Sequence, residues 1–600
     1  MRALVPLLPW LAATALFGMR IGPRQPFAGI DGSWMTVLNG ALGPLRHGDD
    51  VVFNYGPYTF LQVPQIVDRS QFVLGMVALT VVVLWTWTVC HLAFRQCTGR
   101  TASAAAATVT AIVAATQGAA TAAVGAAAGT ILLTLSRPRS PDWRPVLLVP
   151  PVLWGLAGAL VVQVKLSDGV AFTALALVAS LAARRPLLIL LDAAVTLLSF
   201  GAGTVLWWLL AGQEVGDLRA WFAYGVDIVA GYGDAMSSEV PPYLLGYLAA
   251  GIVVVISLVT VLRRRAVQSR TELLGWILVF GVTLGYGVKS GFTRHDVHEL
   301  TFFVVALILL AVAAGLTGLS RTAVTGAVVC LLMVFPGFES IDPGPARDRW
   351  RADVEVALRH DYAAGLLEAT RLEMQTTYAV PQAMLDAIGS APVTIDPHEA
   401  TVAWAYSLTY RPVPVFQNYA VVTERLDRLN ARAIKSASDD RYILRIDTPG
   451  FDGRNAIWES AHYKQAVACN FARLQREGIW SLLGKVDSRC GRVTVEGTQR
   501  VSAGEALEIP PAADGTIVTA SFRPDDGSLL ARLGHLLMKD YTPLRATVDG
   551  QDFKVLAHPA TGPLMLSFPE VDEGAFDPFT YSEVSFSEPG TVTFATVKLR

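Results

Sequence analysis

The stretch LTFFVVALILLAVAAGLTG, residues 300–318, contains no charged side chain. A helix needs about 20 mostly apolar residues to cross the ~30 Å hydrocarbon core of a bilayer, because it rises ~1.5 Å per residue. This stretch therefore predicts a membrane-spanning helix, and it provides a criterion for the rest of the chain.

Applied outward from this stretch, the same criterion finds about eleven spans in all. The others lie near residues 3–19, 72–94, 102–116, 119–136, 146–164, 170–183, 186–211, 241–262, 272–288 and 322–337. Charged residues make up 16% of the 600 residues, against roughly 25% in soluble domains. Only 21 of the 48 Lys and Arg and 16 of the 50 Asp and Glu lie in residues 1–340. The sequence thus predicts a membrane domain, residues 1–340, followed by a water-soluble part.

This composition excludes a purely soluble enzyme, a fibrous protein and a disordered chain. A nucleic-acid partner is also disfavoured, because the net charge of −2 gives no basic surface.

The orientation of the spans follows from Lys and Arg, which are enriched in short cytoplasmic loops. With the N-terminus inside and eleven spans, 13 of the 21 Lys and Arg of residues 1–340 are cytoplasmic. The Ala-rich stretch 102–136 decides whether the number of spans is odd or even, because it is either one long tilted helix or two helices broken at Gln117-Gly118. We favour two, which makes the chain a multi-pass plasma-membrane protein with an extracytoplasmic C-terminal part. Residues 3–19 lack a clean small-x-small cleavage site, so we expect a first span there and no cleaved signal peptide.

The cysteines agree with this orientation. Cys90, Cys97 and Cys330 lie within spans or at their inner ends, whereas Cys469 and Cys490 are the only pair in the predicted outer part. Disulfides persist outside the cytoplasm, so we expect a bridge between Cys469 and Cys490.

The loop KSGFTRHDVHE, residues 289–299, concentrates ionisable side chains directly before the 300–318 span. Charges at a bilayer boundary are costly, so their positions indicate function. We expect Lys289 and Arg294 to bind a phosphate, because Arg contacts its oxygens bidentately and Lys supplies a point charge. The other side chains are expected to contact substrate or, alternatively, to bind a metal ion, although their spacing is not that of His-Glu-x-x-His. They are His295, Asp296, His298 and Glu299.

The first predicted outer loop, residues 20–70, also carries carboxylates. Apolar residues from Trp34 to Leu45 recur at helical spacing, which predicts an amphipathic helix on the membrane surface. Asp31 at its start is either an N-cap or a catalytic carboxylate facing a cavity. Asp49-Asp50 by itself indicates a turn.

Two further loops belong to the same predicted face. The short loop Lys165-Leu166-Ser167-Asp168 supplies a cation that we expect to contact phosphate and a carboxylate that we expect, with Tyr55, to contact substrate. Residues 213–240 predict a second interfacial helix that roofs a cavity.

Outer carboxylates, outer cations and surface helices together indicate chemistry on a lipid phosphate. Activated sugars reach that face of the membrane on polyprenyl carriers. Asp31 would deprotonate an acceptor hydroxyl for attack on the sugar C1, while Lys289 and Arg294 stabilise the departing phosphate. A single base with attack from the opposite face predicts inversion at the anomeric carbon. The scheme requires these three side chains to share one lipid-fed cavity.

In these features the chain resembles the GT-C superfamily of membrane glycosyltransferases, which includes protein mannosyltransferases, the lipid A aminoarabinose transferase and the actinobacterial arabinofuranosyltransferases. The resemblance rests on Asp31 beside a surface helix in the first outer loop, on a body of about eleven spans and on the C-terminal outer domain. It implies that Asp31 is the catalytic base and that Asp49 or Asp50 is the second acidic position.

The same resemblance implies a polyprenyl-phosphate-linked sugar as donor and a glycan or glycoprotein of the cell envelope as acceptor. The Ala/Arg/Val-rich composition is typical of an actinobacterial enzyme, for which arabinofuranose is the expected sugar. The sequence lacks the Trp-Trp-Asp motif of oligosaccharyltransferases, which argues against transfer to asparagine. No cofactor is identified from the sequence, and a divalent metal ion is the only candidate.

The soluble part divides into two predicted segments. Residues 341–490 predict an α/β segment with helical patterning at 350–388, strands near 393–395 and 442–444, and a helix near 424–433. Residues 491–600 alternate between apolar and polar side chains, which predicts a β-sandwich of the kind that binds carbohydrate. Asp396, His398 and Glu399 either line a groove or cap the following helix.

Two other functions stay open at this point. A transporter or flippase for a lipid-linked saccharide would need an internal repeat and spans broken near the midplane, and the sequence has no evident repeat. A non-catalytic assembly factor would keep its function when Asp31 is replaced by asparagine.

Overall fold

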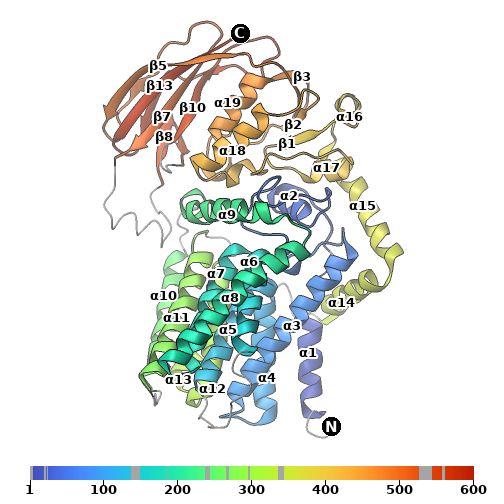
Figure 1. Cartoon of the computed structure of the whole chain (residues 1–600), viewed down its shortest axis with the longest axis vertical. Coiled ribbons are helices and arrows are strands. Elements are labelled where there is room, and N and C mark those ends of the chain that lie inside the picture. The colour runs from blue at the N-terminus through green and yellow to red at the C-terminus, as the bar shows by residue number, and fades with distance from the viewer. Residues whose placement is uncertain are drawn as a thin grey trace. The chain divides into compact units, whose positions relative to one another are not determined.

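The structure is a computed structural model of the whole chain (Figure 1). It describes residues 5–18, 22, 24–136, 149–183, 185–236, 243–264, 269–294, 298–335, 343–525, 543–556 and 561–600. The chain divides into two compact units. The first contains residues 1–25, 55–215 and 239–367, and the second contains residues 26–54, 216–238 and 368–600. Two loops that separate apolar helices in the sequence therefore belong with the C-terminal residues, whereas the predicted boundaries at 340 and 490 stay predictions.

The first unit contains, among its described residues, eleven apolar helices that correspond one to one with the predicted spans. They are α1 (Leu8–Gly18), α3 (Arg69–Phe94), α4 (Arg100–Ala115), α5 (Gly118–Leu135), α6 (Val149–Val164), α7 (Leu166–Ala179), α8 (Pro186–Leu210), α10 (Leu244–Arg264), α11 (Arg270–Gly291), α12 (Leu300–Thr317) and α13 (Arg321–Val334). Seven helical stretches are long and apolar enough to cross a membrane, and α1, α4, α6 and α13 are shorter apolar helices. These helices make the chain a multi-pass membrane protein. After α13 the first unit continues with α14 (Pro343–Leu358).

The Ala-rich stretch 102–136 forms two helices, as predicted. Trp87 of α3 is hydrogen-bonded to Thr108 of α4, and His91, further along α3, is hydrogen-bonded to Ser103, which lies earlier on α4. The two helices are therefore antiparallel. The chain then turns at Gln117, and Gly118 adopts a φ of +77° at the start of α5. The alternative of one long tilted helix is wrong, and the parity of eleven spans is retained.

Helix α12 lies at the centre of the first unit, and 83% of its most apolar window is buried. A helix that is apolar on every face is stable when lipid or other helices surround it, and here the other helices do so. Small residues on α5 allow a close approach, because a Cβ atom at Gly125 would lie 2.4 Å from Ile308 and one at Gly129 would lie 3.1 Å from Val312. The stretch that first indicated a membrane protein is thus the core of its bundle.

The α/β part of the second unit is built on a mixed sheet with strand order β1-β2-β4-β3. Strand β1 (Val393–Asp396) runs parallel to β2 (Tyr442–Ile446), and β4 (Trp480–Lys485) is antiparallel to both β2 and β3 (Phe471–Glu477). The accompanying helices are α15 (His360–Tyr378), which crosses from the first unit, α16 (Gln382–Ile388), α17 (Thr401–Ala405), α18 (Glu424–Lys435) and α19 (Ala461–Asn470). These elements confirm the predicted helices and strands of this segment.

Two antiparallel sheets follow, as the alternating pattern predicts. One has the order β11-β10-β7-β13-β5 and the other β6-β12-β8-β9. The strands are β5 (Cys490–Val501), β6 (Leu507–Glu508), β7 (Thr516–Pro524), β8 (Arg545–Val548), β9 (Gln551–Lys554), β10 (Thr561–Phe568), β11 (Phe579–Thr580), β12 (Glu583–Phe586) and β13 (Gly590–Leu599). Phe522 of β7 and Phe586 of β12 stack between the sheets with ring centroids 4.1 Å apart. The β-sandwich is confirmed, and its affinity for carbohydrate stays a prediction.

Two loop helices complete the second unit, α2 (Gly29–Leu38) and α9 (Val215–Ala235). Helix α2 ends earlier than the apolar spacing predicted, because Asn39 caps it and Gly40 has a φ of +76°. Its apolar side chains Trp34, Val37 and Leu38 are at most 7% exposed, and α2 packs against α17. The predicted amphipathic helix is therefore shorter than expected and buries its apolar face against protein.

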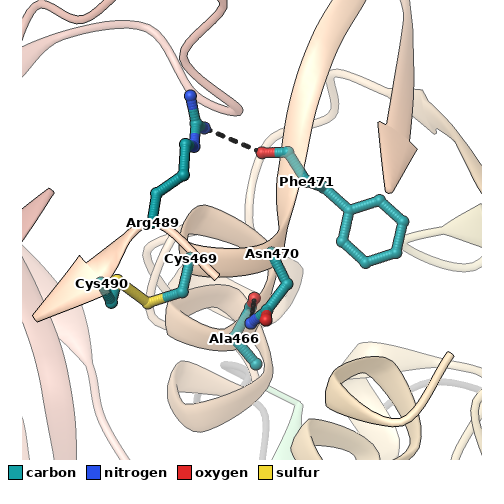
Figure 2. Close-up of a disulfide and its surroundings, with 6 residues drawn as sticks. All are labelled: Ala466, Cys469, Asn470, Phe471, Arg489 and Cys490. Atoms are coloured by element: carbon teal, nitrogen blue, oxygen red, sulfur yellow. Dashed lines mark hydrogen bonds between the residues drawn. A yellow bond between two sulfur atoms is a disulfide. The ribbon is translucent and has the colours of Figure 1, made fainter. Parts of the chain in front are cut away.

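A disulfide joins Cys469 at the end of α19 to Cys490 at the start of β5, as expected from the sequence (Figure 2). Beside it, the Arg489 guanidinium donates a hydrogen bond to the Phe471 carbonyl at 2.9 Å. The bridge links the α/β part to the β-sandwich.

Replacing both Cys469 and Cys490 by serine should destabilise the second unit. The bridge closes a loop with a sequence separation of 21, and removing such a constraint on the unfolded chain costs about 3 kcal/mol. We expect a lower midpoint of thermal unfolding in non-reducing buffer, with no further change when reductant is added. The matched control is Cys97→Ser, which removes a free cysteine and should leave the midpoint unchanged.

Candidate functional site

Asp31 lies in the first turn of α2, where a negative charge interacts favourably with the positive end of the helix dipole. Its side chain is exposed, and the Trp34 indole N–H donates a hydrogen bond to Asp31 Oδ1 at 2.9 Å. The second carboxylate oxygen accepts no hydrogen bond from any residue that the structure describes. The N-cap is Ala28, so the interpretation of Asp31 as the cap is wrong. One oxygen of this exposed carboxylate is oriented by Trp34, and the other has no hydrogen-bond partner among the described residues.

The first turn of α2 is capped by a residue far along the chain. Glu399 Oε2 accepts the Gly29 backbone N–H at 3.0 Å and the Tyr378 hydroxyl at 2.8 Å. Glu399 does not cap the following helix α17, whose N-cap is Ala400 without a side-chain bond. The carboxylate thus satisfies a backbone donor of α2 and leaves Asp31 free of that task.

Two further bonds hold the chain around this turn. Thr401 Oγ1 donates to the Phe27 carbonyl at 3.0 Å, and the Gln417 side-chain amide donates to the Ile30 carbonyl at 2.9 Å. Thr401 is fully buried and so is Gln417. The backbone on both sides of Asp31 is therefore fixed by buried polar groups.

Asp49 and Asp50 lie in a turn, as their sequence indicates. Asp50 Oδ2 accepts the Arg46 backbone N–H at 3.0 Å, and Arg411 lies 3.4 Å from Asp50 Oδ1. The Arg46 guanidinium binds Asp217 in the first turn of α9 through two hydrogen bonds, at 2.8 and 2.9 Å, and lies 3.4 Å from Asp49. Both carboxylates are thus paired with arginines, in contrast to Asp31.

The same turn needs a glycine between Arg46 and Asp49. A Cβ atom at Gly48 would lie 2.5 Å from the Asp217 carbonyl oxygen, and the residue has a φ of +96°. Burial of the neighbouring His47 imidazole lowers its pKa to about 4, so this ring stays neutral at physiological pH. The loop is therefore packed tightly against the start of α9.

Lys165 and Asp168 occupy the start of α7 in the first unit. Asp168 is fully buried and accepts hydrogen bonds from Thr121 and Ser167, both at 3.0 Å. Lys165 Nζ lies 3.7 Å from Asp168 Oδ1 and 5.3 Å from the centroid of the Tyr55 ring. Asp168 therefore joins α7 to α5, and this arrangement fits a structural role better than the predicted contact with substrate.

Lys289 and Arg294 lie at the C-terminal end of α11 and just beyond it. Thr293 Oγ1 donates to the Lys289 carbonyl at 2.7 Å, which extends the helical turn. In the loop that follows, His298 is exposed and Glu299 is fully buried directly before α12. The other two predicted residues of this loop, His295 and Asp296, lie outside the described residues.

Contacts within the first unit bring part of this predicted set to one end of the bundle. The Tyr286 hydroxyl of α11 donates to Thr121 Oγ1 at 3.2 Å, and Thr121 in turn donates to Asp168. Lys289 follows Tyr286 by one helical turn, on the same side of α11. Lys165 and Asp168 are therefore linked to the helix that carries Lys289, and a common site for Lys165 and Lys289 stays a prediction. Asp31, Asp49 and Asp50 belong to the second unit, and a cavity shared with Lys289 and Arg294 stays a prediction.

No group of three or more His, Cys, Asp or Glu side chains suited to a metal ion occurs among the described residues. A metal role for the loop that contains His295 and Asp296 thus stays a prediction.

Sequence reasoning missed a pair of buried cations in the second unit. Arg454 Nη2 and Lys554 Nζ both donate to the Ala235 carbonyl at the end of α9, at 2.6 and 3.0 Å. Arg454 is 5% exposed and Lys554 is 4% exposed. They neutralise the negative end of the α9 dipole. Only the helical pattern of α9 was visible in the sequence, because its partners lie in separate later elements.

Sequence reasoning also missed the partners of Asp396. Lys464 Nζ lies 2.9 Å from Asp396 Oδ2, and the Asn418 side-chain amide donates to Asp396 Oδ1 at 2.7 Å. Burial disfavours the charged carboxylate, but Lys464 and Arg445 hold the pKa of Asp396 below its usual value. Asp396 is 2% exposed, so it supports the sheet and does not line the predicted groove.

The second unit also contains a cavity of ≈ 60 Å³. Its lining includes Glu424, Asp427, Arg454, Glu459 and Lys554. None of the acidic residues predicted to be catalytic lines it, so it is separate from the site around Asp31.

No family model matches the chain, and no curated protein matches it. Among solved structures it is similar to the crystal structure of the Archaeoglobus fulgidus oligosaccharyltransferase in complex with Zn and sulfate, with 12% identity and a TM-score of 0.31, over 74% of this chain and 68% of that chain.

The structural role of Asp168 can be tested by Asp168→Ala. Removing one partner of a buried ion pair and leaving the Thr121 hydroxyl without its acceptor should cost about 3 kcal/mol. We expect a lower thermal midpoint of the purified protein in detergent, and a smaller loss for Asp168→Asn, which keeps an acceptor oxygen. Asp192→Asn in α8, a partly exposed position, is the matched control and should have little effect. Loss of turnover with an unchanged midpoint would instead indicate contact with substrate.

Proposed function

We propose that this chain is an inverting membrane glycosyltransferase that moves a sugar from a polyprenyl-phosphate donor to a glycan or glycoprotein acceptor on the extracytoplasmic face of the plasma membrane. The proposal rests on the exposure and the hydrogen bonding of Asp31. It is an exposed carboxylate with one oxygen oriented by Trp34, on a helix whose backbone is held by Glu399 and Gln417.

The chemistry that we propose follows from this state. An acceptor hydroxyl approaches the open oxygen of Asp31 and loses its proton to it as the hydroxyl oxygen attacks the sugar C1. The bond between C1 and the phosphate oxygen breaks, and the phosphate leaves on the polyprenyl carrier. Displacement from the opposite face inverts the anomeric centre. Asp50, in contrast, already contacts the Arg46 backbone N–H and the Arg411 guanidinium.

Two features of the first unit support a lipid-linked donor. Its apolar helices place the protein in a bilayer, where a long polyprenyl carrier also resides. Lys165 and Lys289 lie at one end of the bundle with Arg294 just beyond α11, where we propose that these cations bind the donor phosphate. From the resemblance to actinobacterial arabinofuranosyltransferases we propose arabinofuranose as the sugar. The loop that contains His295 and Asp296 is the place where we propose a divalent cation, should turnover require one.

The role of Asp31 can be tested by Asp31→Asn in the purified full-length protein, assayed with a panel of polyprenyl-phosphate sugars. Asparagine keeps an oxygen that accepts the Trp34 N–H, so folding should be preserved, whereas the loss of the base should lower kcat about 10³-fold. The matched control is Asp386→Asn, an exposed carboxylate on α16, which should keep full activity. Unchanged turnover in Asp31→Asn would exclude Asp31 as the base. No turnover by the unmodified protein with any donor would favour a transporter or an assembly factor.

The donor-binding role of Lys289 and Arg294 predicts a different kinetic signature. Lys289→Gln and Arg294→Gln should each raise the KM for the donor about tenfold, because each removes a charge-assisted contact with phosphate. The KM for the acceptor should not change. Arg270→Gln, at the opposite end of α11, is the matched control and should keep the KM of the unmodified protein. An unchanged donor KM in both variants would contradict this role.

A further inference from the structure

Strand β5 is the outer edge of the five-stranded sheet, and within the described part of the chain no strand pairs with its second edge. Nine consecutive residues of β5, from Arg492 to Arg500, are exposed. The neighbouring strand β13, in contrast, alternates between buried and partly exposed residues. Natural proteins usually shorten, charge or cover such an edge, because its free N–H and C=O groups pair readily with another strand.

The exposed side chains of β5 differ between its two faces. Val493 and Val495 point to one face and are each 61% exposed. Arg492, Thr494 and Glu496 alternate with them on the other face, where Glu496 accepts a hydrogen bond from Thr596 at 2.6 Å. Arg492 forms no ion pair with any described residue. The strand thus offers an apolar row and an unpaired cation beside an open backbone edge.

The sequence Arg492-Val493-Thr494-Val495-Glu496 is complementary to itself in the antiparallel direction. When Thr494 faces its own copy across a two-fold axis, each Val493 faces Val495 of the other strand and each Arg492 faces Glu496 of the other strand. Opposite charges and β-branched pairs directly across an antiparallel ladder are favourable. The two-fold axis produces both charged pairs, because Arg492 of each copy faces Glu496 of the other, as in an isologous interface.

The state of Arg500 favours this centre over another. Phe594 pairs with Gly497 and Ala595 pairs with Val495, so Glu496 is an extra residue in a β-bulge. The bulge adjoins both candidate centres and does not distinguish them. An alternative centre at Thr498 would face Glu496 against Arg500, but Arg500 is already bound to Asp525 at 2.7 Å, whereas Arg492 forms no ion pair with any described residue.

We propose that β5 is a self-association surface, and that it pairs antiparallel with β5 of a second copy of this chain about a two-fold axis at Thr494. Backbone hydrogen bonds then continue the five-stranded sheet from one copy into the other. Four valine side chains meet on one face, and two Arg492–Glu496 pairs flank the two threonines on the other face. The disulfide from Cys490 to α19 holds the start of the strand in place for this contact (Figure 2). The proposal is independent of the glycosyltransferase function.

Reversing the charge of Arg492 or of Glu496 is the sharpest test, because reversing both charges together should restore the interface. In the full-length protein in detergent, Arg492→Glu faces Glu against Glu and Glu496→Arg faces Arg against Arg, so each should weaken dimerisation about tenfold or more in sedimentation velocity. Combining both changes exchanges the charges and should restore the dimer. Arg500→Glu on the same strand is the matched control and should leave the dimer unchanged. All of these positions are exposed, and an unchanged thermal midpoint verifies that each variant is folded.

A cross-link identifies the register. Directly opposite Cα atoms in an antiparallel pair lie about 4.5–5.5 Å apart, within the range of a disulfide. Thr494→Cys should therefore form a covalent dimer on mild oxidation, through a bond between the two 494 residues, whereas Thr498→Cys, which would face Cys490 of the second copy, should form no bond between the two 498 residues. A protein that is monomeric at every concentration, failure of the double charge exchange to restore the dimer, or cross-linking through position 498 in place of 494 would each overturn the proposal.

Discussion

The packing of the second unit depends on a few charged side chains. They neutralise the ends of two helices, α2 and α9, that lie far from them in the sequence. A helix end carries unpaired backbone groups and about half an elementary charge, so burying it without a partner is costly. Glu399 accepts a backbone N–H at the positive end of α2, and Arg454 and Lys554 donate to the carbonyl at the negative end of α9. All three side chains are less than 10% exposed, so each forms its contact away from bulk water. The signs match the helix dipole at both ends, and this is why two segments that separate apolar helices in the sequence fold with the C-terminal residues.

This arrangement determines what Asp31 can do. An acidic residue at the start of a helix commonly serves as its N-cap, and the sequence left that alternative open for Asp31. Because Glu399 already satisfies the Gly29 N–H, Asp31 retains an open oxygen while the Trp34 N–H limits its rotation. Asp49 and Asp50 are in a different state, since Arg46 and Arg411 pair with them. The three carboxylates of this part of the chain thus differ in how many of their acceptor positions are occupied.

The parts of the fold that were predictable from sequence depend on local patterns. Apolar runs such as residues 300–318 identify the spans, the polar break at Gln117-Gly118 separates α4 from α5, and alternation after residue 490 identifies the sandwich. The parts that were missed depend on contacts across hundreds of residues: Glu399 and Gly29 are separated by 370 positions, and Arg454 and Ala235 by 219. Nothing within one window of sequence distinguishes an amphipathic helix that lies on lipid from one that packs on protein. The length of α2 was overestimated for a related reason, since Leu42 and Leu45 continue the apolar spacing beyond Gly40, where the backbone leaves the helix.

The rule that a charge near a membrane indicates function needs a second criterion, which is the number of partners that the charge already has. Asp168 is fully buried and is engaged by Thr121, Ser167 and Lys165. Taking a proton from a substrate would require it to give up these bonds inside a low-dielectric bundle, where an unpaired polar group is most costly. The same bonds connect α7 to α5 and, through Thr121 and Tyr286, to the helix that carries Lys289. A saturated carboxylate of this kind can position the cations that bind a substrate, whereas an exposed and partly satisfied carboxylate such as Asp31 can exchange a proton with it.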